Sequence, residues 1–553
     1  MSVGTRRSAV ATTCALVLAH ALATVAPARA AVVVDSSDPR CASLPGPFPP
    51  ALDAIRAHEP GLEVLVTSEQ PAIAIPVASW TRPPTRTSGG ALSDLRVAIA
   101  NAACPGSGRT PRVDGATVVD ESLALLTTSS CEGVAFVDPL AGALRAATVS
   151  TPASFAAGIF PNLPAPGASA SRVALSTRMC VAPPPGALDS KGAPVANGCR
   201  PGEPSYYTSF TSGAAVAAGR LFVSSSNLGA GAGTLAPQFL PGTVLVFDLA
   251  RAPLAAAPHP TTPAIFTTAF NPTHVTPYTT PSGRELLLVG GSGALGLRSD
   301  DPATPYREAG GVALGEAAID VIDAEQLRLV ATVPLGLAGL AFERLGIDPS
   351  GRVALIGSAI ARHVYGIDLA PIDALAPDAP FVRLDGIDGP AAAIFDADTP
   401  LVLPGLANGA PFETCPGYVV GVEWASPRRA YATDFCDGTI TVLSAALSGP
   451  APLDPSRIQV HETLPLVAPV GPASVGRPQA PGALRVFAPP GESTQAVVLV
   501  GQPEGLVCVV AVPAPDSAAR AAAAFLALSG LAARAQHGRR RASPEEDVRC
   551  SSR

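Results

Sequence analysis

The sequence predicts an all-β protein: a seven-bladed β-propeller with long loop insertions, an N-terminal signal peptide and a short C-terminal helical tail. The first observation is a strand–turn–strand unit that occurs in residues 123–142 and again in residues 429–449. The second is that the strands of these units carry apolar side chains on both faces, as in sheets covered on two sides. The third is the abundance of Gly (52) and Pro (60), which disfavours long helices between residues 60 and 512.

The two units align around a cysteine. Cys131 matches Cys436, and in both units an acid and a glycine follow the cysteine and an apolar strand follows the turn. The glycine offers the positive φ that a tight hairpin turn needs. Five more units have the same order of strand, turn or insertion, and strand: residues 62–79, 220–249, 284–333, 352–369 and 495–512.

A closed ring is the arrangement that these units favour. A single hairpin cannot bury its apolar face, whereas similar sheets arranged radially cover both faces with their neighbours and leave only short edges. The spacing of the turns is also compatible with a large β-sandwich or with two β-domains, which remain the structural alternatives. The expected β-propeller domain covers residues 61–512.

One part of the chain carries a resemblance. The stretch "AAIDVIDAEQLRLVATVPLG", with the "DPSGRVALIG" and "HVYGIDL" segments that follow it within 317–369, resembles the YVTN-type β-propeller repeats of secreted and surface bacterial proteins. The Tyr-Val-Thr-Asn tetrapeptide is not intact; "YATD" (431–434) and "LTTS" (126–129) come nearest to it. The resemblance implies a β-propeller and an exported location, and no single activity.

The N-terminus has the pattern of a secretory signal peptide. Arg6 and Arg7 precede an apolar run at 9–25, and "ARA" at 28–30 is a small-residue cleavage site. We expect residues 1–30 to be removed after Ala30 and residues 31–60 to form an N-terminal extension. The run is shorter than an uncleaved membrane anchor requires. The protein is therefore expected in the periplasm, at the cell surface or outside the cell.

The C-terminal tail, residues 513–553, differs from the rest of the chain. It combines a short apolar, helix-like run (521–533), an arginine cluster (539–541) and an end expected to be disordered. It is similar to C-terminal sorting tails with a Pro-Glu-Pro motif, although Ala514 and Asp516 flank Pro515 where glutamate is expected. The run is short for a membrane span. Attachment to a membrane or envelope through a degenerate sorting tail and a plain Ala-rich helix both remain open.

The cysteines predict disulfides. Cys14 belongs to the signal peptide and Cys550 to the tail, so eight remain in an exported chain. Eight cysteines allow 105 pairings, and no CxxC motif supports a zinc site. The pairing we expect is Cys180–Cys199, Cys415–Cys436, Cys104–Cys131 and Cys41–Cys508, the last joining the two ends of the domain.

Composition and motifs narrow the function without defining it. Charged residues make up 15% of the chain, the net charge is −7, and no basic stripe lies outside the termini, so nucleic acid is not an expected partner. The G-x-G-x-x-G spacing of Gly291, Gly293 and Gly296 is followed by prolines instead of the helix that a dinucleotide site requires. No catalytic residue or bound cofactor is predicted.

Calcium is the one metal that the sequence suggests. Its candidate ligands are four acids in one loop: Asp385, Asp388, Asp396 and Asp398. The spacing of an EF-hand is missing, and aspartate beside Gly and Pro is also typical of turns without metal.

Two classes of function follow. The first is a monomeric binding scaffold whose insertions at about 143–218, 227–241, 292–316 and 386–428 gather on one loop-rich face and bind a protein, a glycan or a small molecule. Trp80, Trp424, Tyr206 and Tyr207 are aromatic residues that would serve either as contacts or as core. The second is a propeller-class enzyme, either a lactonase-like hydrolase or a quinoprotein-like oxidoreductase, with a site at the central channel. Three or more acids or amides converging there would favour the enzyme.

Overall fold

The computed structural model describes most of residues 113–467 and, outside them, the backbone of eight strands. The described residues are 32–33, 41–43, 52–58, 61–66, 73–77, 113–120, 122–129, 132–138, 143–151, 165, 167–230, 237–297, 311–387, 389–405, 417–467, 480–487, 495–502 and 506–512. The predicted signal peptide, the predicted tail and the segment 92–103 lie outside these residues. The chain divides into two units, 31–511 and a second unit that combines 1–30 with 512–553.

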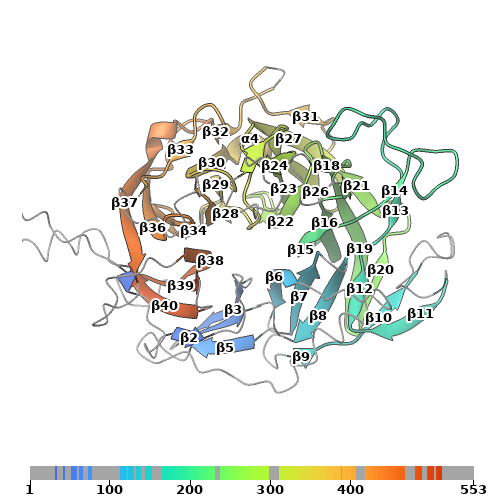
Figure 1. Ribbon diagram of the computed structural model, residues 1–553, viewed down its shortest axis with the longest axis horizontal. Helices are drawn as coiled ribbons and strands as arrows, with labels where there is room; N and C mark the ends of the chain where they lie inside the picture. The colour runs from blue at the N-terminus through green and yellow to red at the C-terminus, as the bar shows by residue number, and fades with distance from the viewer. Residues whose placement is uncertain are drawn as a thin grey trace, which may run out of the picture. The chain divides into compact units, whose positions relative to one another are not determined.

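Residues 31–511 are nearly all β and form a β-propeller (Figure 1). In the described part of the chain, seven sheets have three or more strands, and we name each after its first strand. The first three are the β3 sheet, with β3 (Leu52–His58), β4 (Gly61–Val66) and β5 (Ile73–Val77); the β6 sheet, with β6 (Val113–Asp120), β7 (Leu123–Thr128), β8 (Gly133–Asp138), β9 (Ala143–Leu144) and β12 (Ala174–Ser176); and the β15 sheet, with β15 (Thr211–Ala217), β16 (Arg220–Ser225), β19 (Thr243–Arg251), β20 (Leu254–Pro258), β21 (Ala264–Phe266), β10 (Ala147–Ser150) and β11 (Ser169–Arg172).

The next two are the β22 sheet, with β22 (Pro272–Thr279), β23 (Glu285–Gly291), β26 (Ala317–Asp323), β27 (Arg328–Gly336) and β31 (Val382–Arg383); and the β28 sheet, with β28 (Gly346–Ile347), β29 (Val353–Gly357), β30 (His363–Asp368), β32 (Ala393–Phe395) and β33 (Leu401–Val402). The last two are the β34 sheet, with β34 (Val419–Ser426), β35 (Arg429–Asp434), β36 (Thr439–Ala445), β37 (Ile458–Val467) and β1 (Val32–Val33); and the β38 sheet, with β38 (Ala480–Phe487), β39 (Gln495–Gln502), β40 (Leu506–Val512) and β2 (Cys41–Ser43).

Smaller elements sit on the connections between these strands. They are three two-stranded ribbons, β13 (Cys180–Val181) with β14 (Tyr206–Tyr207), β17 (Leu228–Ala230) with β18 (Gln238–Phe239) and β24 (Leu295–Leu297) with β25 (Gly311–Ala313); the helix α4 (Ala370–Asp373); and the 3₁₀ turn η2 (Pro455–Arg457). No helix among the described residues has the length and apolar character that crossing a membrane would require.

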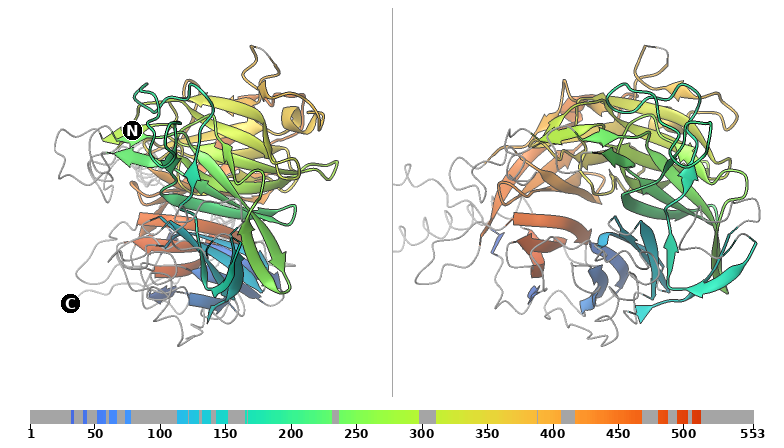
Figure 2. Two further views of the ribbon diagram at one scale, coloured as in Figure 1. Left: turned by 90° about the vertical axis from the view of Figure 1, so that its right-hand side faces the viewer. Right: turned by 45° about the vertical axis from the view of Figure 1, so that its right-hand side comes forward.

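The sheets form a closed ring through their first strands. Each first strand contacts the first strand of the next sheet, in the order β3, β6, β15 and β22 and again from β28 to β34 to β38, while β27 contacts β32 between the β22 and β28 sheets. The contact between β38 and β3 closes the circle. Figure 1 shows these first strands around a common centre, and Figure 2 shows the strands of successive sheets running between the same two ends of the ring.

The predicted strand pairs are confirmed. All seven strand–turn–strand units form adjacent strands of one sheet, each in a different sheet: β4–β5, β7–β8, β16–β19, β23–β26, β29–β30, β35–β36 and β39–β40. Residues 31–60, predicted as an extension, supply β1, β2 and β3. The pairing of β2 with β40 joins the two ends of the ring-forming chain in one sheet. The domain boundary at residue 61 itself stays a prediction.

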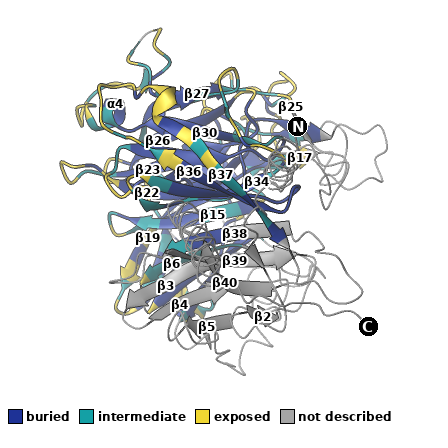
Figure 3. Ribbon diagram, turned by 90° about the vertical axis from the view of Figure 1, so that its left-hand side faces the viewer, coloured by how far each residue is buried: buried dark blue, intermediate teal, exposed yellow. Residues whose placement is uncertain are grey.

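Alternate side chains of one strand enter two different cores. On β23, Leu286 and Leu288 pack in the core shared with the β28 sheet, whereas Leu287 and Val289 pack in the core shared with the β15 sheet. This follows from the two-residue period of a strand when both faces are covered. Figure 3 shows the resulting buried strands and the exposed residues of the connections. Burial on both faces explains why these strands are nearly continuous apolar runs in the sequence.

Glycines allow two of the sheets to approach backbone to backbone. A Cβ at Gly357 of β29 would lie 2.7 Å from the carbonyl carbon of Val419 on β34, and one at Gly346 would lie 3.0 Å from that of Val422. Real Cβ atoms require a larger separation from backbone atoms. Only glycine therefore permits the observed spacing between the β28 and β34 sheets.

A buried ion pair recurs at the same place in two sheets. Arg284, just before β23, lies 2.7 Å from Asp323 at the end of β26, and Arg352, just before β29, lies 2.8 Å from Asp368 at the end of β30. Arg220 and Asp248 occupy the same positions on β16 and β19 at 3.7 Å, where they are more exposed. The aspartates close the "VID", "GID" and "VFD" segments of the predicted repeats, so these acids have a structural role in the repeat.

Candidate binding face at the loop end of the ring

The direction of each strand determines at which of the two ends of the ring the following connection lies. Strands alternate in direction within each sheet, so the connection from second to third strand and the connection to the next sheet lie at the same end. We call this end the loop end. It carries the long connections 177–210, 226–242, 292–316 and 403–418 and the short turns 358–362 and 435–438. Most of the insertions predicted to share a face belong to these connections.

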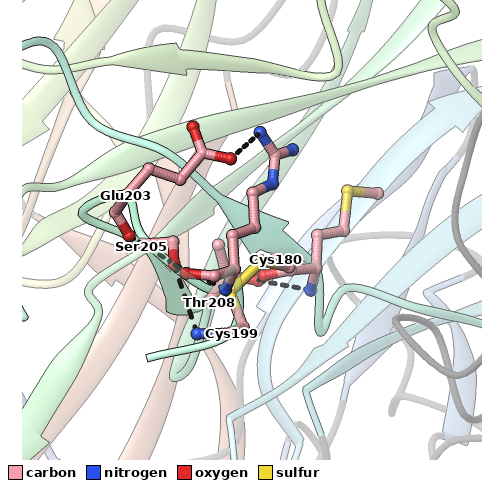
Figure 4. The surroundings of a disulfide bond; sticks show 7 residues. Cys180, Cys199, Glu203, Ser205 and Thr208 are labelled. Carbon is pink, nitrogen blue, oxygen red and sulfur yellow. Dashed lines mark hydrogen bonds and ion pairs between the residues drawn. A yellow bond between two sulfur atoms is a disulfide. The ribbon is translucent and has the colours of Figure 1, made fainter. Parts of the chain in front are cut away.

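The longest fully described connection is held by a disulfide. Cys180 and Cys199 are bonded, with their Cα atoms 5.9 Å apart (Figure 4), which confirms the predicted pair. Ser205 Oγ accepts hydrogen bonds from the backbone N–H groups of Cys199 (3.2 Å) and Arg200 (2.7 Å). Thr208 Oγ1 accepts one from Met179 at 2.8 Å. The connection is therefore fixed by a covalent bond and by side chains at its base.

Breaking this disulfide should expose the connection to proteases. In a Cys180→Ser/Cys199→Ser protein we expect trypsin to cleave after the exposed Lys191 at least about tenfold faster, because the loop loses a constraint and opens locally more often. Cleavage is followed by mass spectrometry under native conditions. Cleavage after arginines of the other sheets serves as the control and should keep its rate. An unchanged rate after Lys191 would mean that the hydrogen bonds alone hold the loop.

The other cysteines are placed unevenly. Cys436 is disulfide-bonded, but its predicted partner Cys415 lies outside the described residues, as do Cys104 and Cys131. Cys41 and Cys508 stand directly opposite each other in the β2–β40 register. Their bond stays a prediction, because only the backbone of these strands is described.

The acids suggested for calcium shape turns. Asp385 accepts a hydrogen bond from the backbone of Ile387 and one from Arg383 Nε, each at 2.9 Å. Asp396 accepts from the backbone of Asp398 and of Thr399. Asp388 lies outside the described residues, and within them no three His, Cys, Asp or Glu side chains gather as metal ligands would. Calcium at this loop remains a prediction without a site.

The predicted contact aromatics divide between core and surface. Trp424 is buried and its Nε1 donates to the carbonyl of Gly346 at 3.0 Å, and Tyr206 is buried with its hydroxyl on the carbonyl of Pro241 at 2.6 Å. Both are core residues. Tyr207 is partly exposed beneath the guanidinium of Arg178, 5.2 Å from the ring centroid. Trp80 lies outside the described residues.

Acids beside the first strands of two neighbouring sheets are paired with arginines. Arg485 of β38 is buried; its Nη1 lies 3.3 Å from Glu423 Oε1 of β34 and its Nη2 lies 3.7 Å from Glu343 Oε2. Arg344 reaches the same Glu423 oxygen at 3.2 Å. Two carboxylates therefore face two guanidinium groups between the first strands of neighbouring sheets. This arrangement binds the sheets together and offers little excess charge to a substrate or metal.

Of the eight large apolar side chains exposed in the described chain, Phe381, Ile387 and Val402 lie between α4 and the end of β33, and the other five lie on connections of the loop end. These five are Leu188 (48% exposed), Phe210 (38%), Leu314 (47%), Leu337 (59%) and Phe342 (46%). Phe210 and Phe342 stand shortly before the first strands β15 and β28. Described parts of three connections pack together at this end: Leu295 of β24 packs with Ile360 of the β29–β30 turn and with Tyr418. The sequence reasoning missed these residues because single apolar residues in loops follow no periodicity.

The ring of sheets, with long connections at one end, defines a β-propeller. No family model matches the chain, and no curated protein matches it either. The resemblance to YVTN-type repeats therefore stays a prediction.

Among solved structures, the chain is similar to the hydrazine synthase of Kuenenia stuttgartiensis (9% identity, 81% of this chain and 92% of that chain, TM-score 0.39). It is also similar to the β-propeller domain of Cps50 (Swd1) from Myceliophteria thermophila (10% identity, 85% and 99%, TM-score 0.41). A third similar structure is the periplasmic gluconolactonase PpgL of Pseudomonas aeruginosa (17% identity, 54% and 67%, TM-score 0.32). At this level of similarity the function has to be argued from the site.

Proposed function

We propose that this chain is an exported, seven-bladed β-propeller that acts as a binding scaffold and takes a protein partner on its loop end. The observation that carries the proposal is that five of the eight large apolar side chains exposed in the described chain lie on connections at that end. Apolar groups gathered on one face of a soluble domain are typical of interaction sites. The seven sheets of the described chain support the blade number, and the signal-like N-terminus and the disulfide support export.

The alternative is a propeller-class enzyme with a site at the channel. Such a site needs converging acids, amides or a metal. The acids Glu343 and Glu423 beside the first strands are paired with arginines, and no specific observation among the described residues favours the enzyme.

A photo-crosslinking experiment tests the scaffold. Phe342 is replaced by p-benzoylphenylalanine in the full-length protein, and the cells that produce the protein are irradiated. Phe381 is the matched control, because it is equally exposed (48%) but belongs to the β30–β32 connection at the other end. We expect a discrete adduct of the Phe342 variant that Leu337→Asp abolishes. Equal labelling of both variants, or none from Phe342, would contradict the proposal.

A further inference from the structure

Three charged side chains form a buried corner on the loop end. Arg362 lies in the β29–β30 turn, Asp434 ends β35, and Asp437 lies in the β35–β36 turn. Arg362 Nη2 donates to Asp437 Oδ1 at 2.8 Å, and its Nε contacts the other Asp437 oxygen. The same Nε lies 3.9 Å from Asp434 Oδ2. Both aspartates are almost fully buried, so one arginine serves two buried acids from the neighbouring sheet.

The two oxygens of Asp434 have different surroundings. Its Oδ1 accepts hydrogen bonds from the backbone N–H groups of Cys436 (2.8 Å), Asp437 (3.1 Å) and Tyr418 (3.5 Å), which fix the turn. Its Oδ2 is buried and accepts no hydrogen bond from the described residues. The positive charge beside this oxygen is Arg362, whose Nε lies 3.9 Å away, too far for a hydrogen bond. Oδ2 is therefore the oxygen of Asp434 on which we expect a proton to bind.

The corner connects several parts of the loop end. The Tyr418 ring lies 6.1 Å from that of Phe435 and also packs with Leu295 and Ile360. If the β35–β36 turn opened, the packing of the β29–β30 turn and of the β24–β25 ribbon would therefore change as well. These are neighbours of the exposed apolar side chains on the same end.

The charge of the corner depends on one proton. With both aspartates ionised the corner carries one excess negative charge, and with Asp434 protonated it is neutral. Burial, followed by the charge of Asp437, raises the pKa of Asp434 to about 6. The neighbouring ring of His363 points to Tyr365, and burial lowers the pKa of His363 from its ordinary value, which disfavours a positive charge there. No other charged group of the described chain is paired with the corner.

We propose that Arg362, Asp434 and Asp437 form a proton-operated latch that holds the β29–β30 and β35–β36 turns together and opens more readily when Asp434 loses its proton. The proposal concerns the turns themselves and requires no partner. Its failure can therefore be distinguished from a failure of the proposed binding function.

The direction of the pH dependence follows from the difference in the pKa of Asp434 between the closed and the open turn. When the turn opens, Asp434 meets water and its pKa falls toward the ordinary value of 3.8. The closed turn thus binds the proton more tightly than the open turn, so closure is most favourable below that value and weakens as the pH rises to about 6. Across this interval the open population should rise about 100-fold.

Amide hydrogen exchange on the full-length protein measures the opening. After correction for the intrinsic exchange rate, we expect the protection of the turn amides at 435–438 to be about 100-fold lower at pH 7.5 than at pH 4. In Asp434→Asn, which keeps the Oδ1 acceptor without the charge, protection should be the same at both values. The control is Asp396→Asn, because Asp396 shapes its own turn in the same way in an exposed loop.

A second variant keeps the test decisive if Asp434→Asn does not fold. In Asp437→Asn, Asp434 becomes the only acid beside Arg362, so the loss of protection should move to lower pH. A wild-type protection that does not change between pH 4 and 7.5 would overturn the latch. A pH dependence that survives in Asp434→Asn, or that disappears in Asp396→Asn, would overturn it as well.

Discussion

Replacing Arg362 by alanine should cost about 3 to 5 kcal/mol of stability at pH 7.5, because two buried carboxylates lose the cation that they share. Thermal and urea unfolding of the full-length protein measure the loss. At pH 4.5 the loss should be smaller, since Asp434 is protonated there and only one ionised acid remains. Asp437 in turn raises the pKa of Arg362 through their hydrogen bond, as expected if the acid and the arginine stabilise each other.

The matched control is Arg383→Ala. Arg383 also bridges two acids, Glu316 and Asp385, at 2.9 Å each, but these side chains form a largely exposed network. Its loss should cost no more than about 1 kcal/mol. Adding Asp434→Asn to Arg362→Ala should restore part of the stability at pH 7.5. Equal costs for the two arginines, or no rescue by the asparagine, would show that the buried charges do not determine the effect.

Sequence pattern identified the strand pairs because each depends on near neighbours. The two strands of a unit are close in sequence or are separated by an insertion, and burial on both faces makes them apolar throughout, as in β26 and β29. Closure of the ring was harder to foresee. The strands β1 and β2 have two and three residues, too few for any periodicity. Only their partners in the last two sheets identify them as strands.

The charged corner could be foreseen only in part. Asp437 is the acid that follows Cys436 in the predicted repeat unit, but its partner Arg362 is 75 residues away in sequence. The four acids between 385 and 398 are close in sequence, which suggested a metal site. The structure shows Asp385 and Asp396 each bound within its own turn. Proximity in the chain did not point to Arg362, because a ring brings distant turns together at its loop end.

The tight contact between Gly290 and His274 gives a second large effect. His274 of β22 is 3% exposed and stands opposite Gly290 of β23 in the register. A Cβ added at Gly290 would overlap the His274 ring carbon Cε1. Because the surrounding core leaves the ring no room, Gly290→Ala should destabilise the protein by about 3 kcal/mol. Thermal unfolding measures the change.

A double-mutant cycle attributes this cost to the imidazole. In a His274→Ala background the ring is gone, so Gly290→Ala should cost less than about 1 kcal/mol, and the difference is the coupling between the two residues. Gly357→Ala is the matched control, because its Cβ would meet the Val419 backbone on the neighbouring strand β34. His274→Ala should not relieve that second clash. If it relieves both or neither, the cost at Gly290 arises from the strand backbone, and the buried histidine is not the reason that this position requires glycine.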